Sequence, residues 1–464
     1  MIAWIIVILT LAAGYGWSSR LLRENSGLAL TLGLALSVGA LTLIMFWESL
    51  LSLPLTFVGI ALPYFVLMLP GWWRVRLPRL TLPSTWGQRF VLLILLVISA
   101  AILFNGAYWP FYRDDTLGIY APAAQAIYQT RALVPLIGTD SLYRAYPVLI
   151  PLSYSYAYFA AGWQNEYLAK AIATLLSLAC LPAAYLLGKQ FRSERVGWLA
   201  ALILILTPFF GRWASSGYVD LPMAFFYTLS ALFALRLWQS SKLLDAALAG
   251  TLMGLAAWTK NAALVGVILL ILWLMWCLIQ RKIGLRTAAV SLIACALVAA
   301  PWYIRNEIGA GFIMPATAWV DQAQRTLDTA FIFVTHTQDF SLPGLLLMFG
   351  VLVALRDLLW KRKLDALVLM LWTLPFFAAW WLLVSYDPRF LLLFLPLLCV
   401  LASDPLVRLW DWIGSAWHPR YAIALTLLTL ILAAPILFNS VDYKPQILRH
   451  PFMGDADKHA IVGH

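Results

Sequence analysis

Charged residues are scarce in this sequence. Only 11% of its 464 residues are Asp, Glu, Lys or Arg, whereas 63% are hydrophobic. A water-soluble chain of this length needs many more polar side chains to cover its core. The composition therefore excludes an ordinary soluble enzyme and favours a chain that is largely buried in lipid.

Several motifs with well-understood chemistry are also missing. The sequence has no G-x-S-x-G, Walker or G-x-G-x-x-G pattern, so a cytoplasmic ATP-driven reaction has no support. Its four cysteines (Cys180, Cys277, Cys295 and Cys399) lie in apolar stretches without a C-x-x-C pair, and we expect buried thiols. His336 has no neighbour at metal-ligand spacing and is expected to be a solvated loop residue.

Long apolar runs are abundant. They predict an all-α, polytopic transmembrane bundle of about fourteen helices. The runs cover residues 1–17, 28–46, 52–71, 89–107, 167–187, 196–210, 217–238, 243–258, 262–280, 285–303, 341–356, 365–385, 390–404 and 421–438. The first run lacks a basic leader and a clear cleavage site, so we expect it to be retained as a helix.

The distribution of charge predicts the orientation of the bundle. Alternate loops carry 20 of the 32 basic residues and only 7 acidic ones. These basic loops lie around residues 20–24, 74–89, 189–195, 236–245, 281–286, 356–365 and 404–420. Cytoplasmic loops are enriched in Lys and Arg, so both termini and the long loops at about 108–166 and 305–340 are expected to be extracytoplasmic. The basic residues are scattered over several short loops, which argues against nucleic-acid binding.

The first long loop carries an acidic pair, Asp114-Asp115, just beyond a predicted membrane helix. Two adjacent carboxylates at this depth are costly unless they are solvated or partnered. The segment from Thr116 to Tyr128 has the spacing of an interfacial amphipathic helix, which is expected to carry Tyr120. The alternative is that the two acids only cap that helix and interact with its dipole.

Other unusual charges converge on the same membrane level. Asp220, Lys260 and Arg389 each lie at the outer end of a predicted helix, and Arg305 begins the second long loop. Each alone is more often an interfacial anchor. Together with the acidic pair they predict a site for an anionic lipid headgroup, where a carboxylate accepts a proton and the cations neutralise phosphate.

These residues resemble the motifs of the GT-C superfamily of membrane glycosyltransferases, in the branch of the protein O-mannosyltransferases and lipid A aminoarabinose transferase. The likeness runs from about residue 89 to 404, between an N-terminal region (1–88) and a C-terminal helix with a short tail (405–464). It is carried by Asp114-Asp115 with the helix after it, Tyr218-Val219-Asp220-Leu221-Pro222, Gly254-Leu255 with Thr259-Lys260, Pro301-Trp302-Tyr303, and Arg389-Phe390-Leu391 with Pro396.

Two departures from the family pattern bear on the site. Asp115 stands where the branch usually has Glu, so the sequence does not decide which of the two acids is the base. The Glu-Lys-Pro motif of the aminoarabinose branch is absent, and the comparable stretch contains Arg144 and Tyr146. Arg144 is therefore a candidate substitute for the missing lysine, with Tyr146 and Tyr386 as supporting residues.

The resemblance implies an inverting sugar transfer from a polyprenyl-phosphate-linked donor at the extracytoplasmic face of the plasma membrane. Asp114 or Asp115 would be the base, Lys260, Arg389 and Arg305 would contact the donor phosphate, and Asp220 and Tyr120 would support them. No cofactor or metal is implied, and the acceptor is left open among a lipid, a glycan and a protein. The competing interpretation is a transporter or flippase, which predicts charges or broken helices near mid-membrane and an internal repeat.

Overall fold

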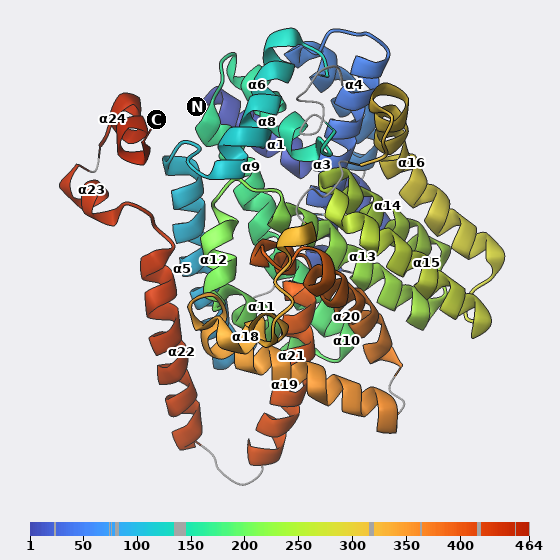
Figure 1. The fold of residues 1–464 in the computed structure, drawn as a ribbon, viewed down its shortest axis with the longest axis vertical. Helices are drawn as coiled ribbons and strands as arrows, with labels where there is room; N and C mark the ends of the chain where they lie inside the picture. Colours follow the sequence, from blue (N-terminus) through green and yellow to red (C-terminus); the bar gives the residue numbers. More distant parts are fainter. Residues whose placement is uncertain are drawn as a thin grey trace.

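The computed structural model describes residues 1–22, 25–73, 75, 77–78, 83–133, 145–314, 320–361, 364–414, 419–450 and 452–463. Within these ranges the chain is helical and contains no strand, which confirms the predicted all-α class. The four cysteine side chains are buried free thiols, also as predicted. Figure 1 shows the helices gathered into one bundle, with α22 and the small helices α23 and α24 at its side.

The helices follow one another with few long interruptions. The first third of the chain forms α1 (Ile2–Ala13), α2 (Tyr15–Leu21), α3 (Ser26–Leu50), α4 (Phe57–Trp72), α5 (Trp86–Tyr108), a π-helical turn η1 (Thr116–Tyr120), α6 (Ala121–Thr130) and α8 (Leu149–Ala161). The middle forms α9 (Glu166–Leu178), α10 (Cys180–Phe191), α11 (Glu194–Ile205), α12 (Pro208–Ala214), α13 (Asp220–Ser240), α14 (Leu243–Thr259), the 3₁₀ turn η2 (Asn261–Ala263), α15 (Leu264–Ile279) and α16 (Leu285–Ala310). The last third forms η3 (Val320–Gln322), α17 (Leu327–Ala330), α18 (Ile332–Thr335), α19 (Thr337–Lys361), α20 (Asp365–Leu383), η4 (Pro388–Leu393), α21 (Leu395–Gly414), α22 (Pro419–Asn439), α23 (Lys444–Arg449) and α24 (Asp455–Val462).

The number of membrane spans differs from the expectation. In the part of the chain that the structure describes, nine helices are long and apolar enough to cross a membrane, or ten if the bent pair α11–α12 counts as one span. The expected fourteen are not confirmed. Three further apolar helices are shorter than the roughly 20 residues of a typical span, and the run at 390–404 is interrupted by η4.

Helix α13 is the centre of the bundle. In its most apolar window 94% of the residues are buried, against 33% for α5 and α19, which therefore face the lipid. Its neighbour α14 packs closely on α16 because Gly250 faces that helix: a Cβ there would lie 1.9 Å from the carbonyl oxygen of Ser291. Small residues allow two helices to approach closely. Such packing matters in a membrane because no hydrophobic driving force favours contact with another helix over contact with lipid.

Three helix breaks bring charged residues to one end of this core. The chain bends by 70° between α11 and α12, and α13 begins a few residues later at Asp220. Helix α14 ends at Lys260, whose backbone is extended (φ −154°, ψ 140°). Helix α20 gives way to η4, where the carboxylate of Asp387 accepts a hydrogen bond from the backbone N–H of Arg389 (2.9 Å). Irregular backbone is tolerated at membrane depth only where it is buried in protein or reached by water.

Ion pairs divide the charged residues into the two groups that the loop charges predict. Arg192 contacts Asp365 (3.1 Å) and Asp404 (3.8 Å), and Arg408 contacts Asp404 (2.9 Å). These residues join three of the basic loops at one end of the bundle. Among the described residues no ion pair links a member of the basic loops to a member of the other set. The two ends of the bundle are therefore distinct.

Candidate active site

The acidic pair begins the helical turn that leads into η1 and α6, so the helix expected after it is confirmed. The inward face of this segment carries Thr116, Tyr120 and Ile127, all buried. Asp115 does not cap the turn, because its side chain makes no capping hydrogen bond. Its carboxylate is instead bound by Arg389, which removes side-chain capping as its role.

The loop before α13 holds the acidic pair in place. The backbone N–H of Asp115 donates to the hydroxyl of Tyr218 (3.0 Å), and Thr116 donates to the carbonyl of Ser216 (3.2 Å). The carbonyl of Gly217 accepts from Tyr154 (2.6 Å). Gly217 has φ +80°, a conformation that side chains with a Cβ rarely adopt, so the loop depends on glycine there. Burial raises the pKa of the Tyr218 hydroxyl to about 12.

Arg389 joins the acidic pair to η4. Its guanidinium contacts Asp115 (Nη1 to Oδ2, 2.6 Å) and Asp387 (Nη2 to Oδ2, 2.6 Å). The guanidinium carbon lies 4.9 Å from the ring centroid of Tyr218 and 5.4 Å from that of Trp213. Burial alone would lower the pKa of Arg389, but Asp387, Asp220 and Asp115 hold it above its usual value. Charge-assisted bonds of this kind fix the position of both partners.

Lys260 forms a second, more deeply buried pair. Its ammonium nitrogen lies 2.7 Å from Oδ1 of Asp220, and the two side chains are 7% and 2% exposed. The same nitrogen is 4.4 Å from the ring centroid of Phe390, the residue after Arg389. The two ion pairs are therefore neighbours, and both Lys260 and Arg389, two of the cations predicted to bind phosphate, already have a carboxylate partner.

Asp114 differs from every other acid of this cluster. It is exposed, and its carboxylate forms no hydrogen bond or ion pair with the residues that the structure describes. Asp115, Asp220 and Asp387 are all bound to a cation. The arrangement thus offers one accessible carboxylate beside a buried group of paired charges.

The other predicted residues fall into two groups. Tyr120 is buried and close enough to Asp220, Asp115 and Tyr146 to interact electrostatically, and Tyr386 interacts with Tyr146 in the same way. These three tyrosines therefore lie at the cluster.

Two further predicted residues are Arg305 and Arg144. Arg305 stacks on Trp302, with 4.7 Å between the guanidinium carbon and the ring centroid, at the end of α16. Arg144 lies outside the described residues.

Sequence reasoning missed Asp387, Tyr218 and Trp213 as site residues. Asp387 and Tyr218 belong to the motifs that drew attention to Arg389 and Asp220, and a carboxylate two residues before an arginine was an available signal.

The expectation for His336 is also corrected: its ring lies 3.2 Å from Asp328 and 3.8 Å from Asp339, so it is not an isolated loop residue. No group of three or more metal-ligating side chains occurs in the described parts of the chain.

Comparisons with known proteins agree with this architecture. Residues 149–304, a third of the chain, match the family described as dolichyl-phosphate-mannose-protein mannosyltransferase. No curated protein sequence matches the chain.

Two solved structures share the fold. The structure of ArnT from Cupriavidus metallidurans bound to undecaprenyl phosphate superposes with a TM-score of 0.54 at 17% identity, covering 81% of this chain and 74% of that one. The oligosaccharyltransferase of Archaeoglobus fulgidus superposes with a TM-score of 0.51 at 14% identity, covering 82% and 60%. The resemblance predicted from the motifs is confirmed: this chain has the fold of the GT-C membrane glycosyltransferases.

Proposed function

We propose that the protein is an inverting glycosyltransferase that moves a sugar from a polyprenyl-phosphate-linked donor to a hydroxyl acceptor at the extracytoplasmic membrane face. The observation that carries the proposal is the accessible carboxylate of Asp114, which is unpaired among the described residues, next to the part-buried Arg389–Asp115 pair and the buried Lys260–Asp220 pair. The shared fold with ArnT, whose structure binds undecaprenyl phosphate, supports a lipid-linked donor.

Asp114 is the base in this mechanism. The acceptor hydroxyl attacks the anomeric carbon as its proton passes to the Asp114 carboxylate, and the bond from that carbon to the phosphate oxygen breaks. The electron pair of that bond stays on the phosphate. Asp115 does not suit this role because its carboxylate is bound to Arg389 at 2.6 Å and serves to position it.

Arg389 and Lys260 stabilise the phosphate as it leaves. Each cation keeps N–H groups beyond those that bind its carboxylate partner, since an ammonium has three donors and a guanidinium five. Charge that develops on the leaving phosphate is stabilised most strongly in a site of low dielectric, and both cations are largely buried. Asp220 and Asp387 hold the two cations in place, and Arg305 and Arg144 are further candidates for the donor phosphate.

The orientation of the site follows from the charge of the loops. The cluster lies at the end opposite the basic loops, which are expected to be cytoplasmic, so we infer that the site and both termini lie outside. A transporter would carry its charges near the middle of the membrane. Here the paired charges lie at helix breaks near one end of the bundle, which favours a surface reaction over transport.

The proposal is tested by release of polyprenyl phosphate from a radiolabelled lipid-linked sugar by the purified protein in lipid nanodiscs. We expect Asp114→Asn to lower turnover by about 10²–10⁴-fold, the usual contribution of a general base. Asp321→Asn, at an exposed carboxylate in η3, is the matched control. Full activity of Asp114→Asn would reject its role, and movement of the intact donor across the bilayer without cleavage would favour a flippase.

A further inference from the structure

A buried lysine in α9 has no part yet in the proposed reaction. The side chain of Lys170 is 0% exposed, and the residue lies one turn after the start of α9. With α10, this helix forms one of the segments that are long and apolar enough to cross a membrane. An ionisable residue inside such a segment is expensive to bury, so its presence points to a function.

The ammonium group of Lys170 binds the backbone that precedes the acidic pair. It donates to the carbonyl oxygens of Trp109 (3.4 Å) and Pro110 (3.1 Å), and its nitrogen lies 4.2 Å from the ring centroid of Tyr112. Its hydrogen-bond acceptors in the described part of the chain are therefore backbone carbonyls rather than a carboxylate. These groups belong to residues 109–112, a non-helical stretch between α5 and the acidic turn, which we call the link.

Glu166 binds the same link from the same helix. Its carboxylate accepts a hydrogen bond from the backbone N–H of Phe111 (3.1 Å). Glu166 and Lys170 are four positions apart, so both side chains lie on one face of α9. We call these two residues the α9 clamp. Helix α9 packs on α5, α8 and α13, and the clamp is thus built on a rigid part of the bundle.

Apolar packing also holds the link. Trp109 and Phe111 are buried, with 5.0 Å between the ring centroids of Trp109 and Tyr443 and 5.1 Å between those of Phe111 and Tyr154. An apolar side chain in place of a buried charge is often neutral or stabilising. Stability alone therefore gives no reason for a lysine at position 170, whereas a fixed path of the link does.

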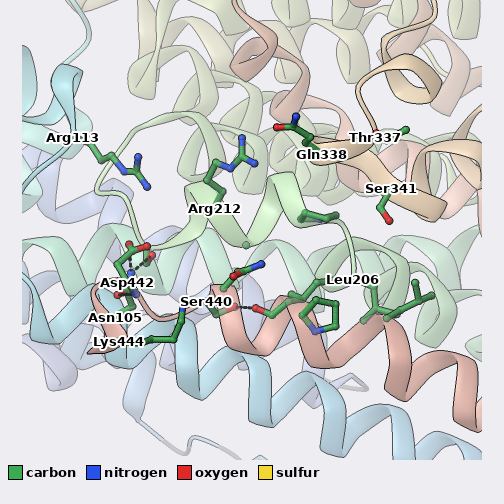
Figure 2. A pocket seen from close by; sticks show the side chains of 17 residues that line it. Asn105, Arg113, Leu206, Arg212, Thr337, Gln338, Ser341, Ser440, Asp442 and Lys444 are labelled. Carbon is green, nitrogen blue, oxygen red and sulfur yellow. Dashed lines mark hydrogen bonds between the residues drawn. The ribbon is translucent and has the colours of Figure 1, made fainter. Parts of the chain in front are cut away.

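The residue between the link and the acidic pair borders empty space. Arg113 lines a cavity of about 650 Å³ together with Asn105 and Asp442. Figure 2 shows Asn105 and Asp442 side by side, joined by hydrogen bonds, with the guanidinium of Arg113 directed toward the same space. Asp442 also accepts a hydrogen bond from the hydroxyl of Tyr112. A close-packed interior leaves no room for movement, but a cavity does, so the start of the acidic turn depends on contacts such as the α9 clamp.

We propose that Glu166 and Lys170 are positioning residues that set the place of the Asp114 carboxylate during sugar transfer. This inference rests on the proposed glycosyltransferase function. The α9 clamp binds residues 109–111, and the bonds of Asp115 hold the chain on the other side of Asp114. The base must come within hydrogen-bond distance of the acceptor proton, and a misplacement of about 1 Å can cost about 10²-fold in rate.

The first test is kinetic and uses the full protein in lipid nanodiscs. Turnover is measured as release of undecaprenyl phosphate from a set of radiolabelled undecaprenyl-phosphate-linked sugars. Lys170→Met keeps most of the bulk of the side chain and removes its donors. We expect kcat to fall by about 10- to 100-fold, with an unchanged KM for the donor. The apparent Tm should change little, because two carbonyls lose a donor but a charge is no longer buried.

Matched variants separate placement from folding. Glu166→Gln keeps a side-chain oxygen that accepts from the N–H of Phe111, so it should restore most of the activity that Glu166→Met loses. Ser177→Ala is the control, because Ser177 is also buried in α9 but donates to Ala173 of its own helix (2.8 Å). Its kcat should equal that of the unchanged protein.

The second test needs no turnover. A nitroxide label on Gly118→Cys reports the motion of η1, because Gly118 is exposed and an added Cβ meets nothing within 4 Å. The four native cysteines are buried and should stay unlabelled. We expect a more mobile EPR line shape when Lys170→Met is added, and no change when Ser177→Ala is added.

Three outcomes would overturn the inference. The first is an unchanged kcat in Lys170→Met. The second is a lower kcat with an unchanged line shape, which would mean that Lys170 acts through its charge and not through placement. The third is a loss of activity that only follows the loss of folded protein. If the unchanged protein cleaves none of the donors, the proposed function is rejected, and the EPR comparison still decides whether the α9 clamp holds the acidic turn.

Discussion

The Lys260–Asp220 pair allows the sharpest test of the structure. Lys260→Met removes the cation 2.7 Å from the carboxylate of Asp220, whose side chain is 2% exposed, and the second oxygen of Asp220 has no hydrogen-bond partner in the described chain. The variant thus leaves a buried negative charge with nothing to compensate it. Removing one partner of such a pair costs about 3–5 kcal/mol of stability.

The measurement is the apparent Tm of the purified protein in one detergent at one heating rate, because unfolding of such a protein is governed by rates as well as equilibrium. We expect a large fall for Lys260→Met and a smaller one for the double variant Lys260→Met with Asp220→Asn, in which neither charge of this pair remains. Lys242→Met, at an exposed position before α14, is the control and should be close to neutral.

This reasoning would be refuted if the stability changes caused by the two substitutions simply added in the double variant. Contacting residues show interaction energies of about 0.5–3 kcal/mol in a double-mutant cycle, whereas independent residues add to within about 0.5 kcal/mol. The same double variant separates structure from catalysis. If it regains stability but not turnover, Lys260 acts on the donor phosphate; if both return, the lysine only balances Asp220.

Three further perturbations test the architecture around the site. Gly250→Leu should prevent close packing of α14 on α16 and reduce the yield of folded protein, while Gly87→Ala, where an added Cβ meets nothing within 4 Å, should not. Gly217→Ala forces a side chain into φ +80° and should lower stability by about 1–2 kcal/mol, measured as a fall in apparent Tm. Tyr112→Phe removes a hydrogen bond to Asp442 and should speed proteolysis of the C-terminal segment; an unchanged digestion rate would show that this bond does not hold the segment.

The site shows which functional residues can be recognised from the charge pattern of the sequence and which cannot. Asp220, Lys260 and Arg389 are recognisable in the sequence because a charge at the end of an apolar run is rare and expensive. Their partners are not recognisable in this way. Lys260 binds Asp220 across 40 positions and Arg389 binds Asp115 across 274, and such pairings depend on which helix ends meet. In the sequence, Asp115, Asp220, Lys260 and Arg389 are four separate charges. In the structure they form two ion pairs, and Asp114 is the accessible acid.

The amino-acid sequence by itself determined that this protein is a helical membrane bundle, that its charges separate into two ends, and that its unusual acids and cations share one of them. These properties follow from local composition, because the bilayer penalises each charge wherever it occurs. Only the tertiary structure decided which charges neutralise one another and that the C-terminal segment is hydrogen-bonded to the end of α5 through Asp442 and Asn105. Those contacts join residues up to 337 positions apart, and no local preference encodes them.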